Sequence, residues 1–290
     1  FGAAAPATFN PREPVGLLAC AGRFPIVFAQ KARECGIPVV CVGVAGMADP
    51  VLREICTRFT WLRGASLGGL MRAFRRGGVR RWTMAGKFHK HVMYYPWRWV
   101  RFVPDWRMLR FYFLRKRRGN NDDSLLLGLI DEMCSEGLEC VSALDLCPEL
   151  LVKEGVLTRR SPTAGETRDI QFGWHLAREM GRLDVGQSVM VTERAVLAVE
   201  AIEGTDRAIA RAGELCSHRG FVVVKVAKPH QDKRFDVPTV GPQTIESMRA
   251  AGATALAVEA GRTILLDEAE TLALAERYGI TITSLTGPPG

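Results

Sequence analysis

The stretch Val15–Ala45, VGLLACAGRFPIVFAQKARECGIPVVCVGVA, decides the fold. Its first apolar run predicts a buried strand, Gly22 a turn, and residues 24–35 an amphipathic helix that Gly36 ends. The β-branched run over 37–45 predicts a second buried strand. Two buried strands joined by a helix form a βαβ unit, which favours a parallel sheet covered by helices.

The rest of the first half continues this pattern. A further strand is expected over 79–86, and a helix with an acidic start and a glycine stop over 122–137. Between them lies a basic, aromatic insert at about 87–119. Residues 14–150 are therefore expected to form a Rossmann-like domain, with helices on both faces of a parallel sheet.

A second domain is expected after a polar, proline-containing stretch over 151–163, which is typical of a linker. Residues 164–285 again alternate helices and strands, beginning with a helix over 169–183 and two strands within 188–201. The predicted fold class is α/β, with a Rossmann-like N-terminal domain and a mixed α/β C-terminal domain that carries catalysis.

Composition restricts the class of protein. The 290 residues are 47% hydrophobic, enough for a real core. The eight cysteines show no CxxC pair and no zinc-ligand spacing, so they are interpreted as small buried residues in a reducing compartment. No uncharged apolar run reaches the roughly 18 to 20 residues that cross a bilayer. We expect a soluble, cytoplasmic protein.

Charge is concentrated in one segment. Residues 72–118 contain fifteen Lys or Arg and one acid, whereas the whole chain has a net charge of +8. Eleven of the 23 aromatic residues lie between Trp82 and Phe113. Rings interleaved with cations are typical of a surface that meets anionic lipid, so Trp82–Arg118 is predicted to dock on the inner face of the cytoplasmic membrane. Nucleic acid is the rival and is not expected; core packing or a subunit contact stays open.

The first strand–turn–helix lacks the GxGxxG fingerprint, because Cys20 stands where a glycine is expected. This disfavours an ordinary dinucleotide-binding dehydrogenase. Gly22 and Arg23 could still bind an anion at the start of the helix, although a tight turn with a solvated arginine explains them equally well.

Three carboxylates follow a strand of the second half. Glu200 and Glu203 come at its end, Gly204 makes the turn, and Thr205 is the expected N-cap of a helix that begins with Asp206. Carboxylate oxygens are the ligands that Mg²⁺ prefers. Acids that favour a helix N-terminus are the simpler interpretation.

The stretch 224–241, VKVAKPHQDKRFDVPTVG, mixes acids, bases and an amide between two prolines directly after a buried strand. Such a stiffened loop at the carboxyl end of a strand is a typical place for catalysis in open α/β sheets. The later stretch 258–267, VEAGRTILLD, offers Glu259 and Arg262 in another turn, which an exposed β-turn explains equally well.

These motifs together resemble a known family. LLACAGRFP (17–25), GNNDDSLLLGLIDE (119–132), MGRLDVGQSVMV (180–191), LAVEAIEGTDRAI (197–209), KVAKPHQDKRFDVPTVG (225–241) and EAGRTILLD (259–267) are similar, in this order, to the UDP-2,3-diacylglucosamine diphosphatases of lipid A biosynthesis, the I type. The resemblance covers roughly residues 14–285.

The resemblance implies a Mg²⁺-dependent homodimeric hydrolase that converts UDP-2,3-diacylglucosamine to UMP and 2,3-diacylglucosamine 1-phosphate (lipid X). Its essential aspartate falls on Asp236. Under this hypothesis the catalytic residues are Asp232, Asp236, Lys228 and Arg234. The metal ligands are Glu200, Glu203, Asp206 and Asp236. The substrate-binding residues are Gly22, Arg23, Asp122, Asp123, Gly204, Thr205, Lys225 and Gln231.

The chain departs from the family pattern at three places: the first turn is ACAG, Val258 stands where relatives often carry glycine, and the insert is unusually basic and aromatic. A non-catalytic nucleotide- or lipid-binding protein of the same fold is therefore the alternative.

Overall fold

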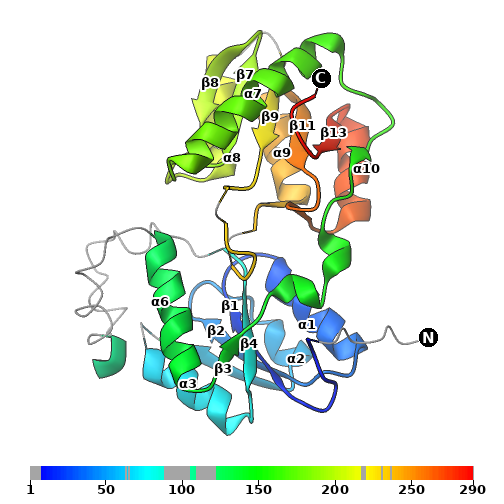
Figure 1. Cartoon of the computed structure of the whole chain (residues 1–290). Coiled ribbons are helices and arrows are strands. Elements are labelled where there is room, and N and C mark those ends of the chain that lie inside the picture. Colours follow the sequence, from blue (N-terminus) through cyan, green and yellow to red (C-terminus); the bar gives the residue numbers. More distant parts are fainter. Residues whose placement is uncertain are drawn as a thin grey trace. The chain divides into compact units, whose positions relative to one another are not determined.

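A computed structural model describes residues 8–62, 64, 66–87, 105–108, 122–216, 220–229, 231–235 and 237–289, with residues 122–125 described only as backbone. The chain divides into two compact units, Phe1–Pro148 and Glu149–Gly290, and each is described by itself (Figure 1).

The first unit is built on a parallel sheet of strand order β3-β2-β1-β4-β5. Its strands are β1 Val15–Ala19, β2 Val39–Val44, β3 Arg58–Leu62, β4 Arg81–Ala85 and β5 Glu139–Cys140. Its helices are α1 Phe24–Glu34, α2 Leu52–Ile55, α3 Leu67–Arg76 and α6 Asp122–Ser135, with a short 3₁₀ turn at Ala143–Asp145. A second 3₁₀ turn, Pro148–Leu150, crosses the boundary between the units. The prediction of a parallel Rossmann-like sheet is confirmed.

Helices cover both faces of this sheet. The connections from β1 through β3 run in one direction along the sheet and those from β3 through β5 return, so right-handed crossovers place α1 and α2 on one face and α3 and α6 on the other. Packing is tight where α3 crosses β1, because a Cβ added to Gly16 would lie 2.9 Å from the Phe74 ring.

The structure corrects one part of the predicted membrane surface. Trp82 lies in β4 with 0% exposure, and its indole nitrogen donates to the Leu138 carbonyl at 3.1 Å. It belongs to the core. The described part of the insert is Asp105–Met108: Asp105 accepts hydrogen bonds from Ser66 Oγ and Gly68 N, while Trp106 is 79% exposed. The rest of the segment from Phe88 to Arg118 lies outside the described residues.

The second unit contains a mixed sheet of order β6-β13-β11-β9-β7-β8 (Figure 1). Its central strands β9, β11 and β13 are parallel, and β6, β7 and β8 join antiparallel. The strands are β6 Gly155–Val156, β7 Ser188–Thr192, β8 Ala195–Val199, β9 Phe221–Lys225, β11 Ala253–Glu259 and β13 Thr281–Leu285, and β10 Thr239–Val240 pairs with β12 Ile264–Leu265.

Helices pack on both sides of this sheet as well. The helices are α7 Ala164–Arg182, α8 Thr205–Leu215, α9 Pro242–Ala251 and α10 Glu268–Tyr278. Helix α7 packs on one face, against alternate residues such as Val189, Val224 and Ala257. Helices α8, α9 and α10 pack on the other, against residues such as Met190 and Val223. The predicted mixed α/β architecture is confirmed.

The stretch 151–163, expected to be a linker, is built into the second unit. Leu151 bridges Ile264, and β6 pairs with β13. Thr163 caps α7 in a reciprocal hydrogen-bonded pair with Glu166, so α7 begins at residue 164 and not at 169 as expected. The polar composition of this stretch reflects its role in capping and edge pairing.

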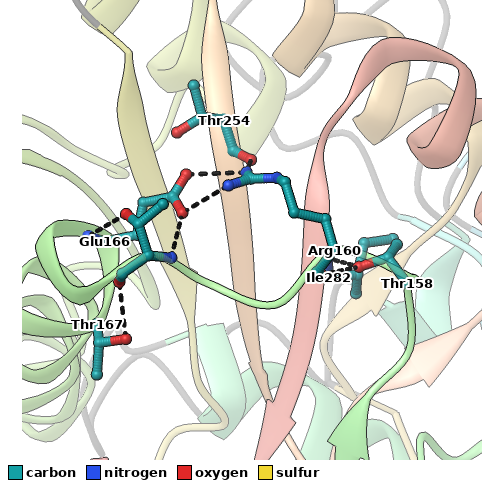
Figure 2. Close-up of polar contacts among 7 residues, drawn as sticks. Thr158, Arg160, Glu166, Thr167, Thr254 and Ile282 are labelled. Atoms are coloured by element: carbon teal, nitrogen blue, oxygen red, sulfur yellow. Dashed lines mark hydrogen bonds and ion pairs between the residues drawn. The ribbon is translucent and has the colours of Figure 1, made fainter.

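Arg160 fastens the same stretch to the sheet. Its guanidinium donates to both oxygens of Glu166, each at 2.9 Å, and to the Thr254 carbonyl at the amino end of β11, at 2.7 Å (Figure 2). Burial alone would raise the pKa of Glu166, but the Arg160 and Thr163 hydrogen bonds outweigh it and lower the pKa to about 2.

None of the helices described is long and apolar enough to span a membrane.

Candidate functional site

A row of residues crosses the second sheet at the carboxyl end of its parallel strands. Ser188 pairs with Lys225, Lys225 with Val258, and Val258 with Ser284, so all four side chains lie on one face. This is the face covered by α8, α9 and α10, because Val223 and Leu256, two residues earlier, belong to their core cluster. Three polar residues thus replace apolar ones where the strands end.

Lys225 is the centre of this row and is only 3% exposed. Its Nζ donates to Thr205 Oγ1 at 3.0 Å and to the Thr239 carbonyl at 3.1 Å. Thr205 Oγ1 in turn donates to Glu200 Oε1 at 2.9 Å. The four residues come from β9, α8, β10 and the end of β8, so a buried cation joins four separate elements.

The backbone around Glu200 and Thr205 depends on two glycines. A Cβ at Gly186 would lie 1.9 Å from the Glu200 carbonyl oxygen, so only glycine fits there. Gly204 has a φ of 85° and is the N-cap of α8. The prediction that Thr205 is the cap is wrong: it is the first residue of the helix, and its hydroxyl faces Glu200 and Lys225 instead.

We call Ser188, Glu200, Thr205, Asp206 and Lys225 the lysine cluster. Within it, Glu200 Oε2, Asp206 Oδ1 and Ser188 Oγ are buried and find no hydrogen-bond partner in the described part of the chain. Glu200 and Asp206 both adjoin Thr205, one through a hydrogen bond and one through the chain. Buried polar atoms are normally satisfied, so the unpaired oxygens of Glu200 and Ser188, next to Thr205 and Lys225, indicate a place that receives a further group.

The structure does not bring every predicted metal ligand into this cluster. Glu203 instead pairs with Arg211, whose Nη2 lies 2.6 Å from Glu203 Oε1. Burial would raise the pKa of Glu203, but its hydrogen bonds, including that from Arg211, outweigh the effect and lower it. Among the residues that the structure describes, no three His, Cys, Asp or Glu side chains form a group that could hold a metal ion.

The charged loop after β9 is held by ion pairs. Lys228 Nζ lies 2.6 Å from Asp184 Oδ1, and Arg234 binds both Asp232 oxygens, the shortest contact being 2.6 Å. The hydrogen bond from Arg234 lowers the pKa of Asp232 against the opposing effect of burial, so Asp232 is an anion at neutral pH. Asp236 lies outside the described residues.

Gln231 closes the start of this loop. Its Oε1 accepts from the Lys228 backbone N–H at 3.0 Å, and its buried Nε2 has no partner among the residues described.

Glu259, interpreted from the sequence as part of an exposed turn, is buried at 3% exposure at the end of β11. It lies on the opposite face from Lys225, the α7 face, since Ala257 belongs to that cluster. Its carboxylate accepts hydrogen bonds from Arg178, Arg262 and the backbone N–H of Ala227. The sequence left open whether Glu259 and Arg262 belong to an exposed turn, because two of the partners of Glu259, Arg178 and Ala227, are distant in the chain.

The predicted anion site of the first unit is a turn at the carboxyl end of β1. Gly22 has a φ of 99°, and Arg23 immediately precedes α1. Ala21 bridges Lys87 beyond β4, so the ends of two neighbouring strands meet. Burial raises the pKa of the neighbouring Cys20 thiol to about 12, so the thiol stays protonated at neutral pH. The side chains of Asp122 and Asp123 lie outside the described residues; both residues start α6.

Family models match both units of the chain. The LpxI N-terminal domain model matches residues 14–150, and the LpxI C-terminal domain model matches residues 153–283. The chain belongs to the LpxI family. The resemblance drawn from the sequence motifs is therefore confirmed.

A curated relative shows similarity along most of the chain. This relative, the UDP-2,3-diacylglucosamine pyrophosphatase LpxI of Caulobacter vibrioides, is 31% identical over 278 residues, which cover 92% of this chain and 96% of the relative. Both units are included in the match, so the lysine cluster, the loop after β9 and Glu259 all lie in segments that the LpxI models span.

Proposed function

We propose that this LpxI-family chain hydrolyses the diphosphate of UDP-2,3-diacylglucosamine, releasing UMP and 2,3-diacylglucosamine 1-phosphate. The observation that carries the proposal is the 31% identity, over 92% of the chain, to a pyrophosphatase named for that substrate. The reaction needs positive charge beside a dianionic diphosphate and an oxygen base or ligand close to it. The carboxyl end of the second sheet contains both residue types.

Lys225 is the group best placed to supply that charge. A lysine that is 3% exposed keeps its ammonium in a low-dielectric environment, where its field acts more strongly on a nearby anion than it would in water. Thr205 and the Thr239 carbonyl orient it. Lys228 and Arg234 each form an ion pair with a carboxylate. We propose that these ion pairs hold the loop in place and that the two cations also attract a phosphate of the substrate.

The lysine cluster also fits a Mg²⁺ ion. Mg²⁺ is usually bound by one or two carboxylates together with substrate phosphates, and Glu200 Oε2 and Asp206 Oδ1 are two carboxylate oxygens that lack a partner within the described chain. When bound, Mg²⁺ would neutralise charge on the diphosphate. We assign Glu200 and Asp206 as its ligands from the described chain, with Asp236 as the further acid that the family resemblance implies. Glu203, already paired with Arg211, is the weakest of the predicted ligands.

Replacing Asp236 with Ala tests the assignment of the reaction. We expect UMP release from UDP-2,3-diacylglucosamine to fall about 10³-fold, the loss typical of one group that stabilises a transition state. The control is Asp169→Ala, whose carboxylate binds two backbone N–H groups of the β7–β8 turn at the other end of the sheet. It should lose stability and keep its turnover.

Chelation completes this test. Release of UMP that EDTA abolishes and Mg²⁺ restores would support the metal assignment. Binding of the substrate without any release of UMP by the wild-type chain would instead favour the alternative, a non-catalytic lipid- or nucleotide-binding protein. Normal turnover by a folded Asp236→Ala chain would remove Asp236 from the mechanism.

We further propose that the chain works as a homodimer in the cytoplasm, on the inner face of the cytoplasmic membrane, through the segment after Trp82. Trp106 supports this, because an indole that is 79% exposed on a segment rich in Lys and Arg suits a lipid interface. Asp105 and Arg107, on either side, are anchored to α3 and to Glu136.

Sedimentation with vesicles tests the membrane proposal. Vesicles that contain phosphatidylglycerol should bind the wild-type chain, and Trp106→Ala should weaken binding about 3- to 10-fold because apolar area at the interface is lost. The partly exposed Phe172 of α7 offers a control variant, Phe172→Ala, which should bind normally. Equal binding to neutral vesicles, or none to either, would contradict the proposal.

A further inference from the structure

The carboxylate of Glu259 fixes the second residue after β9, Ala227. Glu259 Oε2 accepts the backbone N–H of Ala227 at 2.9 Å, and Ala227 is two residues beyond the last residue of that strand. The other oxygen, Oε1, accepts from Arg178 of α7 at 3.1 Å and from Arg262 at 3.2 Å. One buried carboxylate therefore joins the end of β11 to the start of the loop.

Arg262 fixes the next residue from the same side. Its Nη2 donates to the carbonyl of Lys228 at 3.0 Å while its Nη1 binds Glu259. The pair thus holds the N–H of Ala227 and the C=O of Lys228. These two backbone groups lie on either side of the peptide unit that joins Ala227 to Lys228. Pro229 follows and restricts the rotation of the chain, so the direction in which the loop leaves the sheet is set at this point.

Stability of the core alone does not account for this arrangement. Burying a carboxylate is costly unless it is fully paired, and an apolar residue at the end of β11 would serve packing as well or better. The pair is useful where a definite backbone direction is needed. The loop that begins here carries Lys228, Asp232 and Arg234, and Asp236 follows in the same segment of the sequence.

We propose that Glu259, acting with Arg262, is a positioning residue for the reaction: it orients the catalytic loop at the peptide unit Ala227–Lys228. This inference rests on the proposed function and adds to it a residue pair on the α7 face of the sheet. Neither residue is required to touch the substrate. A displacement of about 1 Å in a catalytic group can lower turnover about 10²-fold, so a loop that leaves the sheet in another direction would lose activity and keep its fold.

The two arginines that donate hydrogen bonds to Glu259 allow a matched pair of variants. Arg262 and Arg178 have similar exposure, at 31% and 36% of the side chain, and each donates to Glu259 Oε1. Of these two arginines, Arg262 alone also contacts the described part of the loop backbone, at the Lys228 carbonyl. We expect Arg262→Met to lower kcat for UMP release about 10-fold or more with KM changed less than about 3-fold, and Arg178→Met to leave kcat within about 2-fold of wild type.

Glu259→Gln should lower kcat about 10²-fold, and the double variant with Arg262→Met should lose no more than this, because both substitutions break the same bridge. If Glu259→Gln does not fold, the two arginine variants decide alone. Equal kcat in Arg262→Met and Arg178→Met would overturn the inference, whether both are normal or both reduced. Failure of the proposed function is distinguishable, since the wild-type chain would then release no UMP.

Discussion

At each end of β11 an arginine binds both a carboxylate and a backbone carbonyl, but the two arginines hold different parts of the chain. At its amino end, Arg160 binds Glu166 through both oxygens and also reaches the Thr254 carbonyl (Figure 2). At its carboxyl end, Arg262 binds Glu259 and reaches the Lys228 carbonyl. The first centre ties a helix start to the sheet, whereas the second ties down a loop.

The surroundings of the two ends differ in a second way. Next to the amino-end centre lie the cap of α7 and the hydrogen bond that Thr158 accepts from the backbone N–H of Ile282, both of them structural contacts. Next to the carboxyl-end centre, across the sheet, lies the lysine cluster, in which Glu200, Asp206 and Ser188 each keep an oxygen without a partner in the described structure. The role of an arginine–carboxylate pair therefore depends on the segment that it holds. We expect disruption of the amino-end pair to lower stability, and disruption of the carboxyl-end pair to lower activity.

The largest effect that would sharpen this comparison is expected at Lys225. Lys225→Met removes the buried positive charge that we propose acts on the diphosphate, and kcat for UMP release should fall about 10²- to 10³-fold. The control is Arg194→Met, which removes one positive charge from an exposed position in the β7–β8 turn at the amino end of β9, and its kcat should stay near that of wild type. Turnover of Lys225→Met close to wild type would show that the carboxyl end of the sheet is not the site of reaction.

A smaller effect, on stability and not on turnover, is expected at Glu166. Glu166→Gln should lower the free energy of unfolding at pH 7 by about 1 to 2 kcal/mol, since the pair is partly exposed and screened, and leave kcat unchanged. Because the folded pKa of about 2 lies below the ordinary value of 4.5, the wild-type advantage is present above pH 4.5 and is lost as the pH falls toward 2. Urea titrations at several pH values measure this. A difference that is the same at pH 2 and pH 7 would contradict the assignment to this carboxylate.

Much of the fold follows from the sequence, because apolar runs and helix punctuation are local signals. The run VVCVGV and the paired strands around Glu193 and Arg194 are examples, and both were predicted in place. Strand β3 and helix α3 were missed. Strand β3 lies at the edge of the sheet, and its arginine, threonine and tryptophan give no continuous apolar run. Helix α3, which packs on β2, has two glycines in its first turn, and glycine is a poor helix former.

The candidate site was predictable where one segment of sequence contains it. The loop after β9 and the acids before α8 were found for that reason, and the structure joins Glu200, Thr205 and Lys225 through hydrogen bonds. Glu259 was named with Arg262, but its buried role could not be predicted in this way. Its partners Arg178 and Ala227 lie 81 and 32 residues away, and a short EAGR motif alone does not distinguish a buried carboxylate from an exposed turn. Trp82 shows the converse, since its neighbours are basic but its strand is central.

The most direct measurement is a single assay of UMP release from UDP-2,3-diacylglucosamine by the wild-type chain, Lys225→Met and Glu166→Gln, each confirmed to be folded. We expect the wild-type chain and Glu166→Gln to release UMP at similar rates, and Lys225→Met to be slower by at least about 10²-fold. Similar rates in the two variants, or no release by any of the three chains, would contradict the assignment of the reaction to the carboxyl end of this sheet.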